Sequence, residues 1–230
     1  MQGYIVLLDT GIYEYVGNND SYRETIRTTM WKEFKLHQRQ HWIFDLDGTL
    51  TVSVHDFDYI RAELGLERDV PILEALNAMP AEQAAPLWAR LNEIESHFAS
   101  KAKIMEGSRA LLEKLAARGA RLGIFTRNVM PVVVATLRAC DLEHFFDDAF
   151  LVDRDTCTPK PSPEGIHHLL NLWQAVPEDT VMIGDYLYDM QSGRSAGVTT
   201  IHLDKGRDTS WPEYTDIYIR DYSEITTLVG

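Results

Sequence analysis

Two aspartates follow a short apolar run in HWIFDLDGTLT, residues 41–51. Residues 42–44 have the pattern of a buried strand in a parallel sheet. Because side chains alternate along a strand, we expect Asp45 and Asp47 to share a face. Two close carboxylates repel each other unless a cation or a shared proton compensates them. The segment therefore predicts a cation site at the carboxyl end of a strand, where open α/β sheets bind ligands. A plain Asp-Gly turn with incidental acids is the alternative.

The same residues have the types needed to attack phosphorus. A carboxylate can form an aspartyl-phosphate and so divide hydrolysis into two easier steps, which makes Asp45 the candidate nucleophile. Asp47 could protonate the leaving alcohol and later take a proton from the attacking water. Gly48 permits a tight turn, and we expect the amides there and at Thr49 to face the phosphoryl oxygens of a substrate.

Two later segments carry groups that could hold a phosphoryl group. Thr126, in GIFTRN, offers a hydroxyl just before amides that lead into a helix, and helix N-termini favour anions. Lys160 lies between two prolines in TPKPSPEG, and the prolines restrict the backbone that holds its ammonium group. A fixed ammonium could neutralise both the nucleophile and the transferring group. A common threonine after a strand and a surface lysine in a loop are the alternatives.

A fourth segment, IGDYLYD, carries Asp185 directly after a predicted strand and Asp189 four residues later. If a helical turn begins at Asp185, the two carboxylates lie on one face. Together with Asp45 they supply the hard oxygen ligands that Mg²⁺ prefers. A helix cap would explain Asp185 alone but not the pair. The sequence therefore predicts a magnesium site built from these acids.

The chain that carries these groups alternates strands and helices. Strand-like segments are expected at residues 42–44, 121–126, 149–152, 180–184, 199–203 and 216–221. Helical patterns are expected at residues 108–119, 131–140 and 162–174, and in a short tail after the last strand. This alternation predicts a Rossmann-like, doubly wound parallel sheet of the α/β class.

Residues 53–103 break the alternation, because they carry only helical patterns. In the last of these, an apolar stripe consists of Leu87, Leu91, Ile94 and Phe98. Because the insertion follows the first core strand, we expect a small all-helical cap over the carboxyl edge of the sheet. Helices that only thicken the core are the alternative.

The expected division of the chain is an N-terminal extension of unknown role at residues 1–40, a core of residues 41–52 and 104–230, and a cap of residues 53–103. Within the extension, residues 23–40 have the pattern of a weak helix of mixed charge.

Composition excludes several kinds of partner. A net charge of −13 and a pI near 5.0 argue against binding nucleic acid, because phosphate backbones are held by clustered lysines and arginines. An apolar run of about 18 residues is absent, so we expect no membrane span, and the first residues do not resemble a secretory signal. We therefore expect a cytoplasmic protein that acts on a small phosphorylated metabolite. Cys140 and Cys157 are too few for a disulfide framework and are not spaced as a zinc site. The oligomeric state stays open.

The four segments resemble the motifs of the haloacid dehalogenase-like (HAD) hydrolase superfamily, and the general form is similar to that of phosphoglycolate-phosphatase-like members with a small helical cap. The resemblance spans roughly residues 42–203, and the helical insertion is similar to the first-position cap of that family. It implies that Asp45 is phosphorylated and that Asp47 is the acid and base, with its backbone carbonyl reaching the metal.

For the other motifs, the resemblance implies that Thr126 and Lys160 hold the phosphoryl group. It also implies that Asp185 binds Mg²⁺ and that Asp189 supports the metal directly or through water.

A Mg²⁺-dependent phosphatase acting on a small phosphomonoester is the leading interpretation. A haloacid dehalogenase attacks carbon and needs neither a metal nor a second acid, so Asp47 counts against it. A phosphomutase needs cationic cap residues that hold a second phosphate, for which Arg61 and Arg68 are the candidates. A non-catalytic phosphate-binding or metal-binding protein would be expected to lack one of the catalytic groups.

Substrate contacts are expected near the junction with the cap and after the second motif. His55 lies in the expected hinge, and Arg127 and Asn128 follow Thr126 directly.

Overall fold

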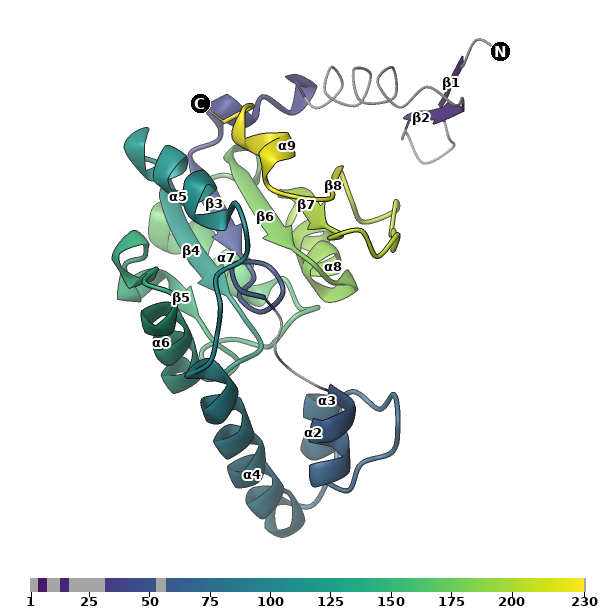
Figure 1. The fold of residues 1–230 in the computed structure, drawn as a ribbon, viewed down its shortest axis with the longest axis vertical. Coiled ribbons are helices and arrows are strands. Elements are labelled where there is room, and N and C mark those ends of the chain that lie inside the picture. Colours follow the sequence, from purple (N-terminus) through teal and green to yellow (C-terminus); the bar gives the residue numbers. More distant parts are fainter. Residues whose placement is uncertain (1–3, 8–12, 17–31, 53–56, 230) are drawn as a thin grey trace.

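The computed structural model describes residues 4–7, 13–16, 32–52 and 57–229. Its main sheet has six parallel strands in the order β5-β4-β3-β6-β7-β8. The strands are β3 (His41–Phe44), β4 (Arg121–Phe125), β5 (Leu151–Val152), β6 (Thr180–Gly184), β7 (Thr199–Leu203) and β8 (Ile217–Ile219). After the central β3, the chain forms β4 and β5 on one side of the sheet and then β6, β7 and β8 on the other. The carboxyl ends of β3, β4 and β6 therefore meet at the topological switch point (Figure 1).

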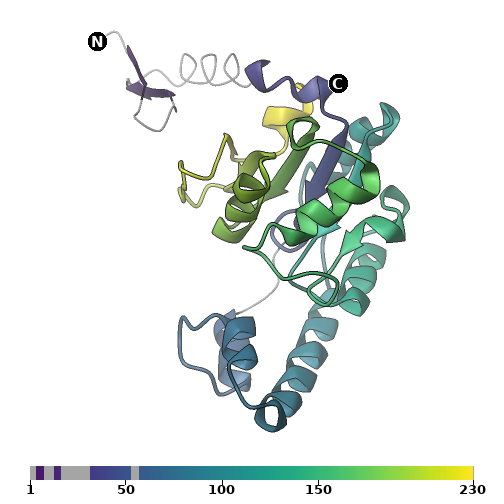
Figure 2. The ribbon, with the colours of Figure 1, turned by 180° about the vertical axis from the view of Figure 1, so that it is seen from behind.

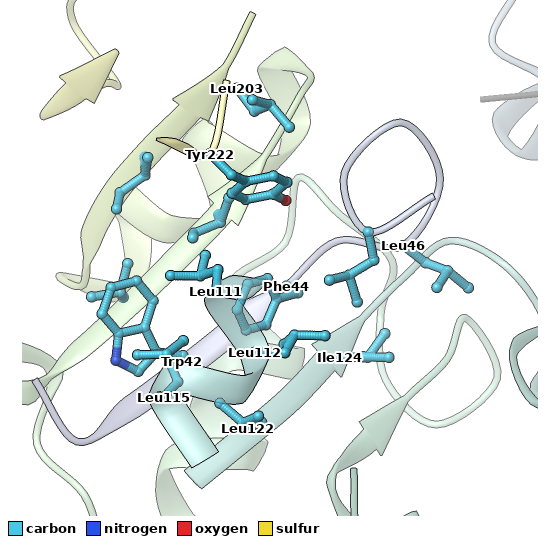
Figure 3. Close-up of a cluster of buried hydrophobic side chains, with 14 of the residues drawn as sticks. Trp42, Phe44, Leu46, Leu111, Leu112, Leu115, Leu122, Ile124, Leu203 and Tyr222 are labelled. Carbon is cyan, nitrogen blue, oxygen red and sulfur yellow. The ribbon is translucent and has the colours of Figure 1, made fainter. Parts of the chain in front are cut away.

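Helices cover both faces of this sheet, which confirms the predicted doubly wound α/β fold. Side chains alternate along β3, so Trp42 and Phe44 pack with leucines of α5 on one face (Figure 3), whereas Ile43 joins the apolar cluster on the other. The first face carries α5 (Ser108–Ala117), α6 (Met130–Ala139) and α9 (Ser223–Thr226). The second carries α7 (Glu164–Trp173) and α8 (Leu187–Ala196).

Local sequence accounts for several element ends. Pro131 lies in the first turn of α6, where its fixed φ and missing N–H are tolerated. In α5, Leu111, Leu112 and Leu115 recur at helical spacing and are fully buried. Strand β5 is two residues shorter than expected, because residues Asp148–Phe150 form a 3-10 helix before it.

Three helices lie between β3 and α5 in the chain. They are α2 (Phe57–Glu63), α3 (Ile72–Asn77) and α4 (Ala81–Ala99). They surround an apolar cluster of their own, which includes Ile60, Leu76 and Leu91 and is separate from the two clusters of the sheet. Figures 1 and 2 show them projecting beyond the strand ends. These helices thus form a cap and do not thicken the core; the borders of the domains at residues 53 and 103 stay a prediction.

The segment before β3 differs from the expectation. Strands β1 (Tyr4–Leu7) and β2 (Tyr13–Val16) pair antiparallel. The weak helix expected over residues 23–40 is wrong in its described part, because residues 32–38 form two 3-10 helices, η1 (Lys32–Phe34) and η2 (Leu36–Gln38). Lys35 separates them with a left-handed backbone, at a φ of 49°.

Within the part of the chain that the structure describes, no helix combines the length and apolar character needed to cross a membrane.

Candidate active site

A cavity of about 450 Å³ lies where the strand ends of the core meet the cap. The core contributes most of the residues singled out in the sequence, because the loops after β3, β4, β5 and β6 all open toward it. They are Asp45, Asp47, Thr126, Arg127, Asn128, Lys160, Asp185 and Asp189. The structure therefore brings the four sequence segments to one place, as the strand ends predict.

The centre of this site is a cluster of three buried carboxylates. One oxygen each from Asp45, Asp185 and Asp189 lies within 4.8 Å of the others. Lys160 is 2 % exposed, and its Nζ donates to Asp45 Oδ1 and to Asp189 Oδ1, both at 2.6 Å. Lys160 therefore serves two of the three acids, whereas the third, Asp185, is paired with Lys205 at 2.9 Å. Hard carboxylate oxygens at this spacing fit the ligand set that Mg²⁺ prefers.

Burial and mutual repulsion shift the acidities of this cluster. Burial raises the pKa of Asp45 to about 8, with Asp189 and Asp185 adding to the rise and Lys160 opposing it. Burial also raises the pKa of Asp189. For Lys160, burial lowers the pKa, but the adjacent carboxylates outweigh that effect and the net shift is upward. The ammonium form of Lys160 is therefore secure, whereas ionising the acids calls for further positive charge.

Asp47 lines the cavity, but strand alternation is not the reason. Strand β3 ends at Phe44, so strand alternation does not extend to Asp47 and the shared-face argument is wrong for it. Asp47 instead lies in the following turn, and its Oδ2 accepts a hydrogen bond from the Asn128 side-chain amide. The Asn128 backbone N–H donates to Thr126 Oγ1 at 3.2 Å. The first and second segments are thus joined through Asn128.

The expected helical turn from Asp185 is also wrong. Helix α8 begins at Leu187, with Tyr186 as its N-cap, so Asp185 precedes the helix. Asp189 lies in the first turn, where its Oδ2 accepts from the Tyr186 N–H at 3.0 Å. The two acids still converge, because Asp185 extends from the end of β6 while Asp189 turns back toward it.

Gly48, Thr49 and His55 stand apart from the other candidates. Gly48, at a φ of +86°, packs so closely on Asp185 that a Cβ would lie 2.5 Å from its Oδ2. Thr49 is fully buried and is not part of the cavity wall; its carbonyl accepts from Tyr222 Oη at 3.1 Å. His55 lies outside the described residues.

Two cations after β7 were not singled out in the sequence. Lys205 Nζ donates to Asp185 Oδ2 at 2.9 Å and to the Gly48 carbonyl at 2.7 Å. Arg207 Nη2 donates to the Asp185 carbonyl at 2.6 Å and lies 3.2 Å from its Oδ2. They fix the orientation of a candidate metal ligand. The only sequence signal is a pair of cations after a strand, in LDKGRD.

Ion pairs join the cap to the core beside the cavity. Arg127 Nη2 donates to both carboxylate oxygens of Glu74 on α3, at 2.8 Å each, and the guanidinium lies 5.0 Å from the Tyr188 ring centroid. Arg154, after β5, is buried and pairs with Glu95 of α4 at 3.0 Å. Side chains from the loops after β4 and β5 therefore hold two different cap helices.

Of the two cap arginines considered for a second phosphate, only Arg61 lines the cavity. Its Nε donates to the Val70 carbonyl at 2.9 Å, and its Nη1 pairs with Asp58 at 3.2 Å. Arg68 is exposed and is not part of the cavity wall.

Comparison with known proteins finds one matching family model and several similar proteins. A family model described as haloacid dehalogenase-like hydrolase matches residues 54–203. An uncharacterized hydrolase of Saccharomyces cerevisiae is 29% identical over 195 residues, covering 81% of this chain and 89% of the yeast protein. The pyrophosphatase PpaX of Halalkalibacterium halodurans is 25% identical over 206 residues, covering 82% of this chain and 95% of PpaX.

Among solved structures, a predicted phosphoglycolate phosphatase from Haemophilus somnus superposes with a TM-score of 0.68 at 18% identity, covering 84% of this chain and 99% of that one. This similarity establishes the shared fold. The family model covers more than half of the chain, and its enzymes carry out hydrolysis. The chain therefore belongs to the haloacid dehalogenase-like hydrolases.

Proposed function

We propose that this protein is a Mg²⁺-dependent phosphatase that hydrolyses a small phosphomonoester through an aspartyl-phosphate on Asp45. The observation that carries the proposal is the Asp45 carboxylate, which is held by Lys160 at 2.6 Å and lies beside Asp185 and Asp189. An acid with its own hydrogen-bond partner, Asp47, lines the same cavity. Nucleophile, cation, metal ligands and acid are thus all within one site.

The reaction uses these side chains in two steps. A phosphate seated against Lys160 and the Thr126 hydroxyl presents its phosphorus to Asp45. The carboxylate oxygen of Asp45 forms a bond to phosphorus as the ester P–O bond breaks, and Asp47 donates its proton to the departing alkoxide. Asp47 then takes a proton from water, whose oxygen attacks the phosphorus of the phosphoaspartate; the bond between phosphorus and the Asp45 oxygen breaks, which regenerates the Asp45 carboxylate and releases inorganic phosphate. Asn128 holds the Asp47 carboxylate in place for both transfers.

Asp45, Asp185 and Asp189 would hold the Mg²⁺, together with the Asp47 backbone carbonyl that the resemblance implies. The ion would supply positive charge to the oxygens of the phosphoryl group. Lys205 and Arg207 orient Asp185 for that role.

The other interpretations have less support. The Asp47–Asn128 pair has no use in a dehalogenase that attacks carbon. A phosphomutase needs a cation on the cap for a second phosphate, but Arg61 is paired with Asp58 and Arg68 lies off the cavity wall. The names of the relatives, a pyrophosphatase and a phosphoglycolate phosphatase, support a small phosphorylated substrate. A cytoplasmic location, and the lack of nucleic-acid or membrane partners, stay predictions.

Phosphate release from an aryl phosphate tests the proposal. The wild-type protein should release phosphate with Mg²⁺ and lose activity in excess chelator. Asp45→Asn should abolish turnover, because the nucleophile is gone. Asp47→Asn should still attack an aryl phosphate, whose leaving group needs no proton, but should dephosphorylate slowly.

Asp148→Asn is the matched control, since Asp148 is exposed and does not line the cavity. It should keep its activity. Full activity in chelator, or halide release from a 2-haloacid without phosphatase activity, would overturn the proposal.

A further inference from the structure

Most of the cap residues that line the cavity are apolar. Helix α2 contributes Phe57 and Ile60, the start of α3 contributes Pro71, Ile72 and Leu73, and α4 contributes Leu91. The core side carries the carboxylates and Lys160. A cavity that is charged at one end and apolar at the other fits a ligand with the same division.

The charged groups on the walls do not supply a second anion site. Three arginines line the cavity among the described residues, and each has a carboxylate within 3.2 Å. Arg61 faces Asp58, Arg127 faces Glu74, and Arg207 faces Asp185. Arg61 and Arg127 each have an acid of their own, whereas Arg207 shares Asp185 with Lys205 on the carboxylate side of the cavity. A second anion on the cap side would therefore lose its water without gaining a new counter-charge.

Acids on the cap wall act in the same direction. Asp69 and Glu95 both line the cavity, and the buried Arg154 pairs with Glu95 at 3.0 Å. An anionic group at the far end of a substrate would therefore meet an apolar surface and the negative charge of Asp69.

We infer that the substrate is the phosphate monoester of an uncharged, largely apolar alcohol or phenol. Its organic group carries no second phosphate and no carboxylate, and it is not a sugar phosphate with a second anionic group. The phosphate lies on the carboxylate side, and the organic group packs on the apolar residues of α2, α3 and α4. The 450 Å³ cavity limits that group to a small molecule. This inference rests on the proposed function and names its substrate class.

The test compares pentyl phosphate with 5-(phosphonooxy)pentanoate, which differ only in a terminal methyl or carboxylate group. Both leaving alcohols have similar acidity, so chemistry at phosphorus is matched. We expect kcat/KM to be at least about 10-fold higher for pentyl phosphate, since pockets discriminate by about this much for a single apolar group. Equal values, or a preference for the carboxylate, would overturn the inference.

Ile72→Lys places a cation on the apolar wall, where Ile72 is half-buried. It should lower the preference for pentyl phosphate by about 10-fold or more. The control is Leu172→Lys, which adds the same charge at an exposed position of α7 away from the cavity. It should leave the preference unchanged. An unchanged preference in Ile72→Lys would count against the apolar wall as the specificity element.

Ethyl phosphate has a much smaller apolar group than pentyl phosphate, so its hydrolysis depends less on the apolar wall. Circular dichroism should show that Ile72→Lys is folded, and the exposed variant Leu172→Lys should hydrolyse ethyl phosphate at the wild-type rate. Mg²⁺-dependent hydrolysis with a preference for 5-(phosphonooxy)pentanoate would reject the inference about the substrate but not the proposal that the protein is a phosphatase. No phosphate release from these esters or from aryl phosphates would reject both.

Discussion

Replacing Gly48 tests how closely the turn after β3 controls Asp185. A Cβ at this position would lie 2.5 Å from Asp185 Oδ2, whereas ordinary van der Waals contact begins at 3.4 Å. In Gly48→Ala the carboxylate oxygen must therefore retreat by about 0.9 Å, the difference between these two distances. Lys205 and Arg207 hold the same carboxylate, so a retreat also disturbs their hydrogen bonds.

The size of the effect follows from two separate costs. The φ of +86° at Gly48 disfavours any side chain and should lower stability by about 1–2 kcal/mol. Mg²⁺ demands near-ideal octahedral geometry at about 2.0–2.1 Å, so a displaced carboxylate should weaken its binding. Disturbing the support of a metal ligand typically reduces affinity by about 10-fold to 100-fold, and we expect Gly48→Ala to fall in that range.

Gly119→Ala separates the two costs. Gly119 has a similar φ of +76°, but a Cβ there has no neighbour within 4 Å. Both variants should lose stability in denaturant titrations, whereas only Gly48→Ala should lose Mg²⁺ affinity by calorimetric titration of chelator-stripped protein. The same Mg²⁺ affinity in both variants would refute the role of Gly48 in positioning Asp185.

Three further predictions concern charge. In metal-free protein the raised pKa of Asp45 keeps its carboxyl protonated in the folded state at pH values where it is already ionised in the unfolded chain. The free energy of unfolding should therefore fall from about pH 4 to about pH 8, by up to about 1.4 kcal/mol per pH unit. In denaturant titrations with chelator, Asp45→Asn should flatten this slope. Lys205→Met should weaken Mg²⁺ binding by about 10-fold or more in calorimetry, because Asp185 loses a fixed partner, and unchanged affinity would contradict that role. Arg154→Met should lower stability by about 3–5 kcal/mol, because it removes the partner of buried Glu95. Adding Glu95→Gln should recover part of this loss. Purely additive effects in this double-mutant cycle would contradict a coupled pair.

The sheet could be predicted because each of its strands has a local signal. Buried runs such as residues 42–44 and 180–184 end at charged or glycine residues, and the helices between them carry clear apolar spacing. Since carboxyl ends of parallel strands meet at one edge, the convergence of Asp45, Thr126 and Asp185 followed from the order of elements alone.

The ends of elements were less predictable. Nothing in DLDG shows that β3 stops at Phe44, and nothing in GDYLYD shows that α8 starts at Leu187 and not at Asp185. In each case one or two residues decide which side chains share a face. The acids converged by other means, through a turn at Asp47 and a helix start before Asp189.

Contacts between distant parts of the chain could not be predicted from one sequence. Lys205 is 157 positions from Gly48, and Arg154 is 59 positions from Glu95. Neither pair has a local pattern, because each depends on how loops and the cap fold back onto the sheet. The positioning of Asp185 and the attachment of the cap therefore became visible only in three dimensions.

Locating the covalent intermediate tests the proposed mechanism most directly. Asp47→Asn protein, mixed with an aryl phosphate and Mg²⁺ and quenched in acid, should accumulate a phosphoryl group that peptide mass spectrometry places on Asp45. The additional change Asp45→Asn should remove it. A phosphoryl group on another residue, or turnover by Asp45→Asn at the wild-type rate, would contradict the mechanism.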